Sequence, residues 1–143
     1  MSHSCVENYI HIIFSTKNRR PLISLEMEDR LYSYLAGIAK KKGVVILKIN
    51  GTEDHIHMLI KLHPSIALAT MVKEFKSYST GWMKKCGVED FSWQEGYGAF
   101  SYSKSFLDRV IRYIENQKEH HKFVSFADEL DKLKKLWGIA WDF

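Results

Sequence analysis

Apolar and polar residues alternate with a period of two, or β-branched residues cluster, along four short stretches of the chain, which predicts four β-strands. These strands fall at residues 9–16, 44–50, 55–62 and 97–102. Apolar residues at helical spacing predict four helices. The helices cover residues 25–42, a segment from Ser65 past Trp82, a segment from a capping box at residues 105–108 to about residue 117 or beyond, and a last segment from Ser125 to Gly138.

The order of these elements is strand, helix, strand, strand, helix, strand, followed by further helices. This order is typical of the ferredoxin-like, or RRM-like, α+β fold, in which an antiparallel sheet carries helices on one face. Asn50-Gly51 is a turn signal, so the strands on either side of it should pair antiparallel. No repeat or Pro/Gly-rich linker interrupts the chain, which predicts one domain over residues 1–143. We expect the second sheet face to stay open.

The third predicted strand carries the motif His55-Ile56-His57. Alternation places both imidazoles on one surface, opposite the apolar residues that anchor the strand, with Cβ atoms roughly 6–7 Å apart. Two neutral imidazoles at this separation can hold one divalent ion. A single His-x-His also occurs by chance on surface strands, so the motif needs support from other residues.

The composition, with 45% hydrophobic and 27% charged residues, is typical of a globular protein. No apolar run approaches the roughly 18–20 residues that span a bilayer, and residues 1–5 lack the pattern of a signal peptide. These absences predict no membrane partner and a cytoplasmic location. Cys5 and Cys86 are isolated thiols without the spacing of a disulfide framework or a zinc site.

The formal net charge is +4 and the isoelectric point is near 9.0. Basic residues gather in short clusters that suit either solvated helix faces or a phosphate-binding surface. The candidate DNA contacts among them are Lys17, Arg19, Arg20, Lys73, Lys76, Arg109 and Arg112.

Tyr113 and Gln117 lie four residues apart on the third predicted helix, so they share one helical flank. Either could simply pack at the edge of the apolar stripe. Their combination with the two histidines and the nearby basic residues favours a functional site. His11, on the first strand, is expected to be a sheet residue, and the residues leave open whether His120 or His121 also reaches a metal.

Three separated segments, residues 53–59, 93–101 and 113–121, resemble signatures of the single-tyrosine HUH transposases. This family includes the small transposases of insertion sequences that move as single-stranded DNA and the REP-associated tyrosine transposases. The similarity extends over nearly the whole chain, from the first strand to the last helix.

The resemblance implies that Tyr113, carried by an additional C-terminal helix pair, is the nucleophile and that His55, His57 and Gln117 bind Mg²⁺ or Mn²⁺. It implies cleavage and rejoining of hairpin-bearing single-stranded DNA through a 5′-phosphotyrosine intermediate. It also implies a homodimer whose active sites can take their tyrosine from the same or the partner subunit.

The residues also permit a function of a different class. A non-catalytic or domesticated nucleic-acid-binding module could use the same ferredoxin-like sheet and would not need the two histidines and Tyr113 together. The sequence also contains no acidic triad suited to a DDE-type transposase or a two-metal nuclease.

Overall fold

The computed structural model describes residues 4–139 of the chain. The prediction of one domain over residues 1–143 stays a prediction, and the segment screened for a signal peptide lies partly outside the described residues. The regular elements follow in this order along the chain: β1 (Tyr9–Ser15), α1 (Leu25–Lys41), β2 (Val45–Gly51), β3 (His55–Lys61), α2 (Leu68–Lys85), β4 (Gly98–Tyr102), α3 (Leu107–Glu115), α4 (Gln117–His120) and α5 (Phe126–Trp137), with short 3-10 turns at Lys17–Arg19 and Lys104–Phe106.

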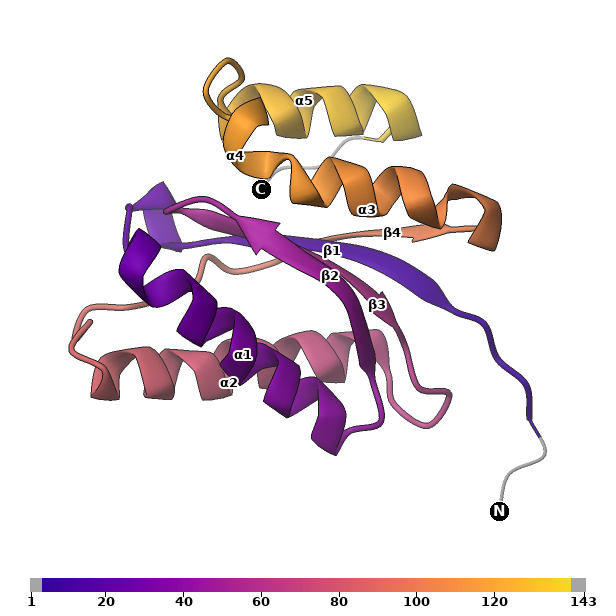
Figure 1. Cartoon of the computed structure of the whole chain (residues 1–143), viewed down its shortest axis with the longest axis horizontal. Helices are drawn as coiled ribbons and strands as arrows, with labels where there is room; N and C mark the ends of the chain where they lie inside the picture. Colours follow the sequence, from indigo (N-terminus) through magenta and orange to yellow (C-terminus); the bar gives the residue numbers. More distant parts are fainter. Residues whose placement is uncertain (1–3, 140–143) are drawn as a thin grey trace.

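The four strands form one antiparallel sheet in the order β2-β3-β1-β4, which confirms the ferredoxin-like prediction. β1 and β3 are central, and His57 pairs with Ile13 across them. In Figure 1, α1 and α2 lie below the sheet, while α3, α4 and α5 lie above it. Among the described residues, none of the helices has the length and apolar character needed to cross a membrane.

The lower sheet face forms the main hydrophobic core. Ile12 and Phe14 of β1 and Met58 of β3 are fully buried there against Leu35 of α1 and Phe75 of α2. Burying each such side chain stabilises the fold by about 1.5–3 kcal/mol. This core fixes β3 at the centre of the sheet, so the alternate residues of β3, including both histidines, must point to the upper face.

The expectation that the second sheet face stays open is wrong. Both predicted ligands, His55 and His57, have no exposed surface because α3 and α5 cover them. Strands β1 and β3 carry apolar residues on this face too, and Leu59 packs against Ile114 of α3 while Ile13 packs against Leu130 of α5. These apolar residues need cover, since exposing them to water is unfavourable.

Two predicted helix starts are also wrong, and one is confirmed. α2 begins at Leu68 without a side-chain cap, and Ser65 instead contacts the ring of His63. α3 follows a 3-10 turn, so Ser105 does not cap it. Ser125 does cap α5 and accepts a hydrogen bond from the Asp128 backbone at 3.1 Å. Gly138 ends α5 in the left-handed conformation, as predicted.

Candidate metal and nucleophile site

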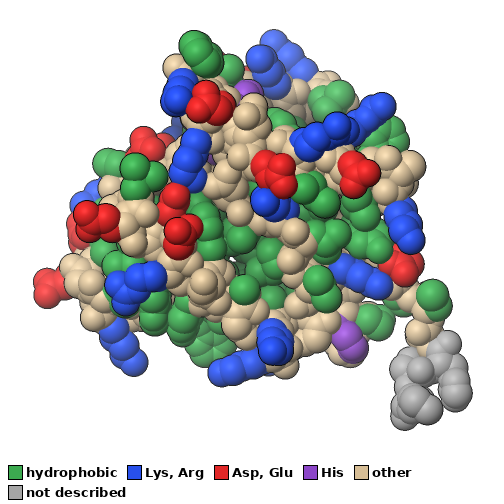
Figure 2. All heavy atoms as spheres, viewed as in Figure 1, with side chains coloured by type: hydrophobic (Ala, Val, Ile, Leu, Met, Phe, Trp, Pro, Cys, Tyr) green, Lys and Arg blue, Asp and Glu red, His purple; other side chains and the backbone are tan. Residues whose placement is uncertain are grey.

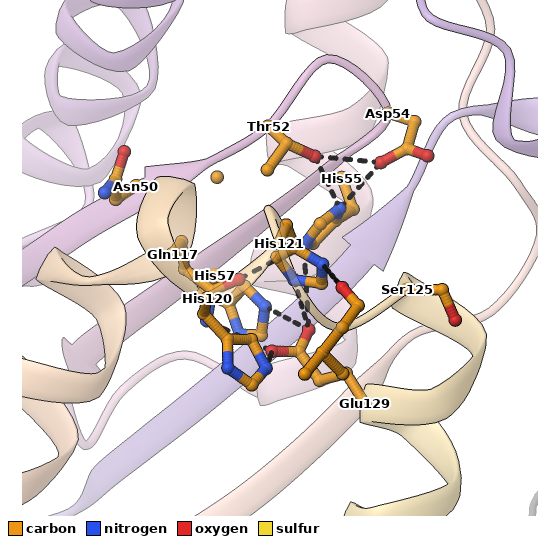
Figure 3. A network of polar contacts seen from close by, with 12 residues as sticks. Asn50, Thr52, Asp54, His55, His57, Gln117, His120, His121, Ser125 and Glu129 are labelled. Carbon is orange, nitrogen blue, oxygen red and sulfur yellow. Dashed lines mark hydrogen bonds and ion pairs between the residues drawn. The ribbon is translucent and has the colours of Figure 1, made fainter.

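His55 begins β3 and is oriented by the tight turn that joins β2 to β3. Gly51 is required there, because a Cβ atom at that position would lie 2.1 Å from the backbone oxygen of His55. His55 Nδ1 lies 2.7 Å from Asp54 Oδ1, to which it donates a hydrogen bond. On the other side, the ring of Phe126 stacks on the imidazole at a centroid distance of 4.0 Å. Nε2 of His55 therefore points into the space between β3 and the C-terminal helices (Figure 3).

His57 lies beside His55, with their ring centroids 5.2 Å apart. Its Nδ1 atom is 2.8 Å from Nε2 of His11, which places His11 behind it in the sheet. Burial lowers the pKa of His57 to about 4 and holds the pKa of His11 well below its ordinary value. Both rings are therefore neutral at pH 7, and neutral imidazole is the form that binds metals. His11 is a sheet residue, as predicted, and it also orients His57.

Tyr113 and Gln117 come from consecutive helices rather than from one continuous helix. Asn116 departs from helical geometry between α3 and α4, and the two helices meet there. The ring of Tyr113 nevertheless lies 5.6 Å from that of His57, centroid to centroid. Gln117 is buried, with Oε1 3.3 Å from His55 Nε2. The structure thus brings together all four residues that the resemblance singled out: His55, His57, Tyr113 and Gln117.

Glu129 of α5 is the residue at the centre of this cluster that sequence reasoning missed. Its Oε1 atom lies 2.9 Å from His57 Nε2, and its Oε2 atom accepts hydrogen bonds from Tyr113 Oη and, at 3.1 Å, from Gln117 Nε2. Glu129 lies three residues after Phe126 and four before Leu133, within the apolar stripe of the helix. A carboxylate inside such a stripe is a signal that could have identified it.

Burial by itself would raise the pKa of Glu129, but hydrogen bonds from His121 and His57 outweigh it and hold this pKa far below its ordinary value. Burial and the adjacent carboxylate raise the pKa of Tyr113 strongly. In this state the carboxyl group is ionised and the phenol is protonated. The phenol therefore donates to Glu129 and is not itself an activated nucleophile.

Both histidines of the 120–121 pair reach the same carboxylate. His121 Nε2 lies 3.2 Å from Glu129 Oε1, and His121 Nδ1 donates to the backbone oxygen of Val124 at 2.7 Å. His120 Nε2 lies 3.2 Å from Glu129 Oε2, but it is buried and makes no hydrogen bond of acceptable geometry among the described residues. Figure 3 shows the rings of His55, His57, His120 and His121 gathered around Glu129.

This donor set suits a divalent ion. His55, His57, His121 and Glu129 each offer one ligand atom, and these atoms all lie within 4.8 Å of one another. Imidazole nitrogen and carboxylate oxygen are ordinary ligands of first-row divalent metals. The hydrogen bonds between His55 and Asp54 and between His57 and His11 are of the kind that orients metal-binding histidines. The predicted metal assignment for His55 and His57 is therefore chemically reasonable in three dimensions.

The predicted DNA contacts lie in different parts of the molecule. Arg109 and Arg112 line an open cavity of about 640 Å³ together with Tyr113 and His120. The guanidinium of Arg19 lies over the ring of Phe126, so it is also near the cluster. Lys17 shares the 3-10 turn with Arg19, and Arg20 pairs with Asp90. Lys73 and Lys76 belong to α2, below the sheet.

Lys76 holds the loop before β4 by donating to the backbone oxygen of Gln94 at 2.8 Å. In the view of Figure 2, the basic side chains are interspersed with acidic ones rather than gathered in one tract. The two arginines of α3 are thus the predicted basic residues that share an opening with Tyr113.

The buried histidines should make the metal-free protein sensitive to acid. Because the pKa of His57 is lowered to about 4, the unfolded chain takes up a proton as the pH falls below the ordinary value while the folded protein does not. The contribution of neutral His57 to the free energy of unfolding is therefore complete above about pH 6.5 and decreases toward pH 4. At pH 5 the loss from this one group is roughly 2 kcal/mol relative to neutral pH.

The lowered pKa values of His11 and Asp54 act in the same direction as that of His57. The raised pKa of His121, whose pairing with Glu129 outweighs its burial, opposes them. Urea unfolding in the presence of a chelator at pH 7.5 and pH 5 measures the net loss. Equal free energies of unfolding at the two pH values would contradict the expectation.

The comparisons with known proteins agree with this fold. A family model described as IS200-like transposase matches residues 4–117. The chain therefore belongs to the IS200-like transposase family, whose members are in general terms enzymes that cleave and transfer DNA strands. The family match includes His55, His57, Tyr113 and Gln117, and it ends before His121 and Glu129.

Two curated relatives have comparable length. The ISDra2 transposase TnpA of Deinococcus radiodurans is 26% identical over 116 residues, which cover 76% of this chain and 83% of the relative. The transposase of the insertion sequence element IS200 from Salmonella typhimurium is 29% identical over 120 residues, which cover 78% of each protein.

Two solved structures share the fold. The structure of a REP-associated tyrosine transposase bound to a REP hairpin aligns with a TM-score of 0.66 at 16% identity, over 87% of this chain and 76% of that one. A crystal structure from Deinococcus radiodurans R1, described as that of a candidate transposase, aligns with a TM-score of 0.67 at 23% identity, over 82% of this chain and 95% of that one.

Proposed function

We propose that this chain cleaves and rejoins single-stranded DNA that carries a hairpin, through a covalent 5′-phosphotyrosine intermediate on Tyr113. The observation that carries this proposal is the meeting of a tyrosine hydroxyl with a buried histidine cluster able to hold a divalent ion. His55, His57 and Gln117 would hold Mg²⁺ or Mn²⁺. When bound, such an ion offsets negative charge on a phosphate and lowers the cost of removing the phenol proton.

The chain's own residues supply the remaining steps. The oxygen of Tyr113 attacks phosphorus, the new O–P bond forms, and the bond from phosphorus to the 3′ oxygen breaks. Glu129 Oε2 already accepts the hydrogen bond of the phenol, so it is positioned to take this proton. The departing 3′ oxygen takes up a proton to become a free hydroxyl. Attack by this hydroxyl, or by one from another strand, reverses the step and rejoins the DNA without an external energy source.

The surroundings of Tyr113 suit a phosphate chain. Arg109 and Arg112 open onto the same cavity as the phenol, and arginine pairs with phosphate through parallel N–H donors. The REP-associated relative with this fold was solved with a DNA hairpin, which supports a hairpin substrate here. A homodimer remains part of the proposal. Tyr113 and the histidine cluster already meet within one chain, which favours action of the tyrosine in the same subunit.

The direct test is to incubate the protein with labelled single-stranded hairpin DNA and Mn²⁺ and to separate the products under denaturing conditions. We expect a DNA-linked protein of reduced mobility and a released fragment with a free 3′-hydroxyl. Removal of the ion with a chelator should abolish both products, and returning Mn²⁺ or Mg²⁺ should restore them. Hairpin binding without any linked product under either metal would instead favour the non-catalytic nucleic-acid-binding module.

A further inference from the structure

Hydrogen-bond partners determine which nitrogen of two histidines points into the cluster. His55 donates from Nδ1 to Asp54, and His121 donates from Nδ1 to the Val124 backbone oxygen. Nε2 of each ring is therefore the nitrogen that faces Glu129. Without a metal, His121 Nε2 donates its proton to this carboxylate, and loss of that proton leaves the lone pair that binds a metal ion. These two Nε2 atoms lie 3.6 and 3.2 Å from the same carboxylate oxygen, Glu129 Oε1.

Facing lone pairs in a buried site repel unless a proton or a metal ion lies between them. The spacing suits an ion, because metal–ligand bonds of about 2.1 Å place neighbouring ligand atoms about 3.0–3.4 Å apart. The distances from Glu129 Oε1 to Nε2 of His57, His121 and His55 are 2.9, 3.2 and 3.6 Å. Four ligand atoms thus converge from β3, the end of α4 and α5.

We propose that His121 and Glu129 are metal ligands together with His55 and His57, and that this three-histidine, one-carboxylate site prefers Zn²⁺, Co²⁺ or Mn²⁺ to Mg²⁺. The inference rests on the proposed function and revises its metal part, because His121 and Glu129 here take the ligand role given there to Gln117, whose amide N–H donates to Glu129. Mg²⁺ favours an octahedron of oxygen ligands and keeps much of its water, whereas imidazole suits the transition metals. His121 and Glu129 lie beyond residue 117, so the C-terminal part of the chain supplies ligands that the family match does not include.

This coordination also joins α5 to the sheet. Glu129 Oε1 faces the histidines while Oε2 accepts from Tyr113, so one carboxylate connects the ion site with the phenol. Four protein ligands enclose a tetrahedral ion, as in structural zinc sites, whereas an ion of higher coordination number keeps positions for other oxygens. Zn²⁺ should therefore stabilise the fold, and the midpoint of thermal unfolding should rise with its concentration.

Cobalt absorption tests the ligand set without reference to DNA cleavage. The full chain, freed of metal with a chelator, is titrated with Co²⁺, whose visible absorption is much stronger in four-coordinate than in six-coordinate sites. We expect the strong spectrum, its loss on adding Zn²⁺, and its persistence in roughly hundredfold excess of Mg²⁺. His121→Ala and Glu129→Gln should each weaken Co²⁺ binding about tenfold or more. His63→Ala, a ring outside the cluster whose side-chain hydrogen bonds are to Ser65, should change it less than about twofold.

A weak six-coordinate spectrum of the unmodified chain, or displacement of Co²⁺ by an equal concentration of Mg²⁺, would overturn the inference without any variant. Loss of affinity in Gln117→Ala together with unchanged affinity in both His121→Ala and Glu129→Gln would also overturn it. The DNA-linkage assay measures activity and is independent of these metal-binding measurements. An intact four-ligand cobalt site in a protein that never links to DNA counts against the proposed function and leaves the ligand set standing.

Discussion

Tyr113→Phe is expected to eliminate the covalent protein–DNA product, with a loss on the order of 10³-fold or more, because it removes the oxygen that we propose attacks phosphorus. The substitution removes one hydroxyl and keeps the ring that contacts His57 and His120. The fold should therefore survive, with a cost of about 1 kcal/mol for the hydrogen bond to Glu129 that is lost. Denaturing electrophoresis of labelled hairpin DNA after incubation with Mn²⁺ measures the product.

Tyr102→Phe is the matched control for this experiment. Tyr102 belongs to β4 on the same side of the sheet, and its ring lies 6.3 Å from that of His11, yet the hydrogen bonds and ion pairs of Glu129 within the described residues do not include it. Tyr102→Phe also removes one phenolic oxygen, but it should leave the amount of linked product unchanged. A linked product that persists in Tyr113→Phe and disappears in Tyr102→Phe would move the nucleophile to β4 and refute our assignment.

His57→Ala is expected to reduce both metal binding and DNA linkage by roughly 100-fold or more, since even residues behind a ligand change affinity by 10–100-fold. His57 contacts His11 on one side and Glu129 on the other, and it has no exposed surface. Its loss removes a ligand and leaves the Glu129 carboxylate with one fewer partner. Calorimetric titration with Mn²⁺ measures the affinity, and the linkage assay measures activity.

His63→Ala is the control for His57→Ala. His63 follows the same strand two residues after its end, and its contacts are to Ser65 rather than to the cluster. Affinity and activity should both be retained. Equal metal affinity in His57→Ala and the unmodified chain would remove His57 from the ligand set.

Mixing the two inactive variants tests whether one chain completes the site. Tyr113→Phe retains the histidines and His57→Ala retains the phenol, so a tyrosine that acts in the partner subunit would restore linkage in the mixture. The contact between Tyr113 and Glu129 within one chain leads us to expect no restoration. Recovery of about a quarter or more of the activity would show a composite site. About half of the dimers in the mixture contain both variants, and each of these would have one intact site that combines the histidines of one subunit with the tyrosine of the other.

The alternating pattern of the strands determined the antiparallel sheet and the shared orientation of His55 and His57, because successive strand residues necessarily face opposite sides. The apolar stripe of the last helix and the signals at Ser125 and Gly138 determined α5 equally well. Capping patterns failed at Ser65 and Ser105, where the chain enters its helix through a turn that satisfies the backbone differently. Local signals therefore predicted the elements better than their starting residues.

The surroundings of the histidines depended on tertiary structure alone. The packing of Leu130 against Ile13 places α5 over the upper sheet face. This packing brings Glu129 next to His57, which lies far away in the sequence. No period or spacing encodes such a contact. The sequence determined that β3 presents two imidazoles on one face, since that is a property of the strand itself. Only the fold decided that these imidazoles are buried, that His57 is neutral, and that the carboxylate of Glu129 connects them to Tyr113. Burial and charge pairing arise only when distant segments of the chain meet.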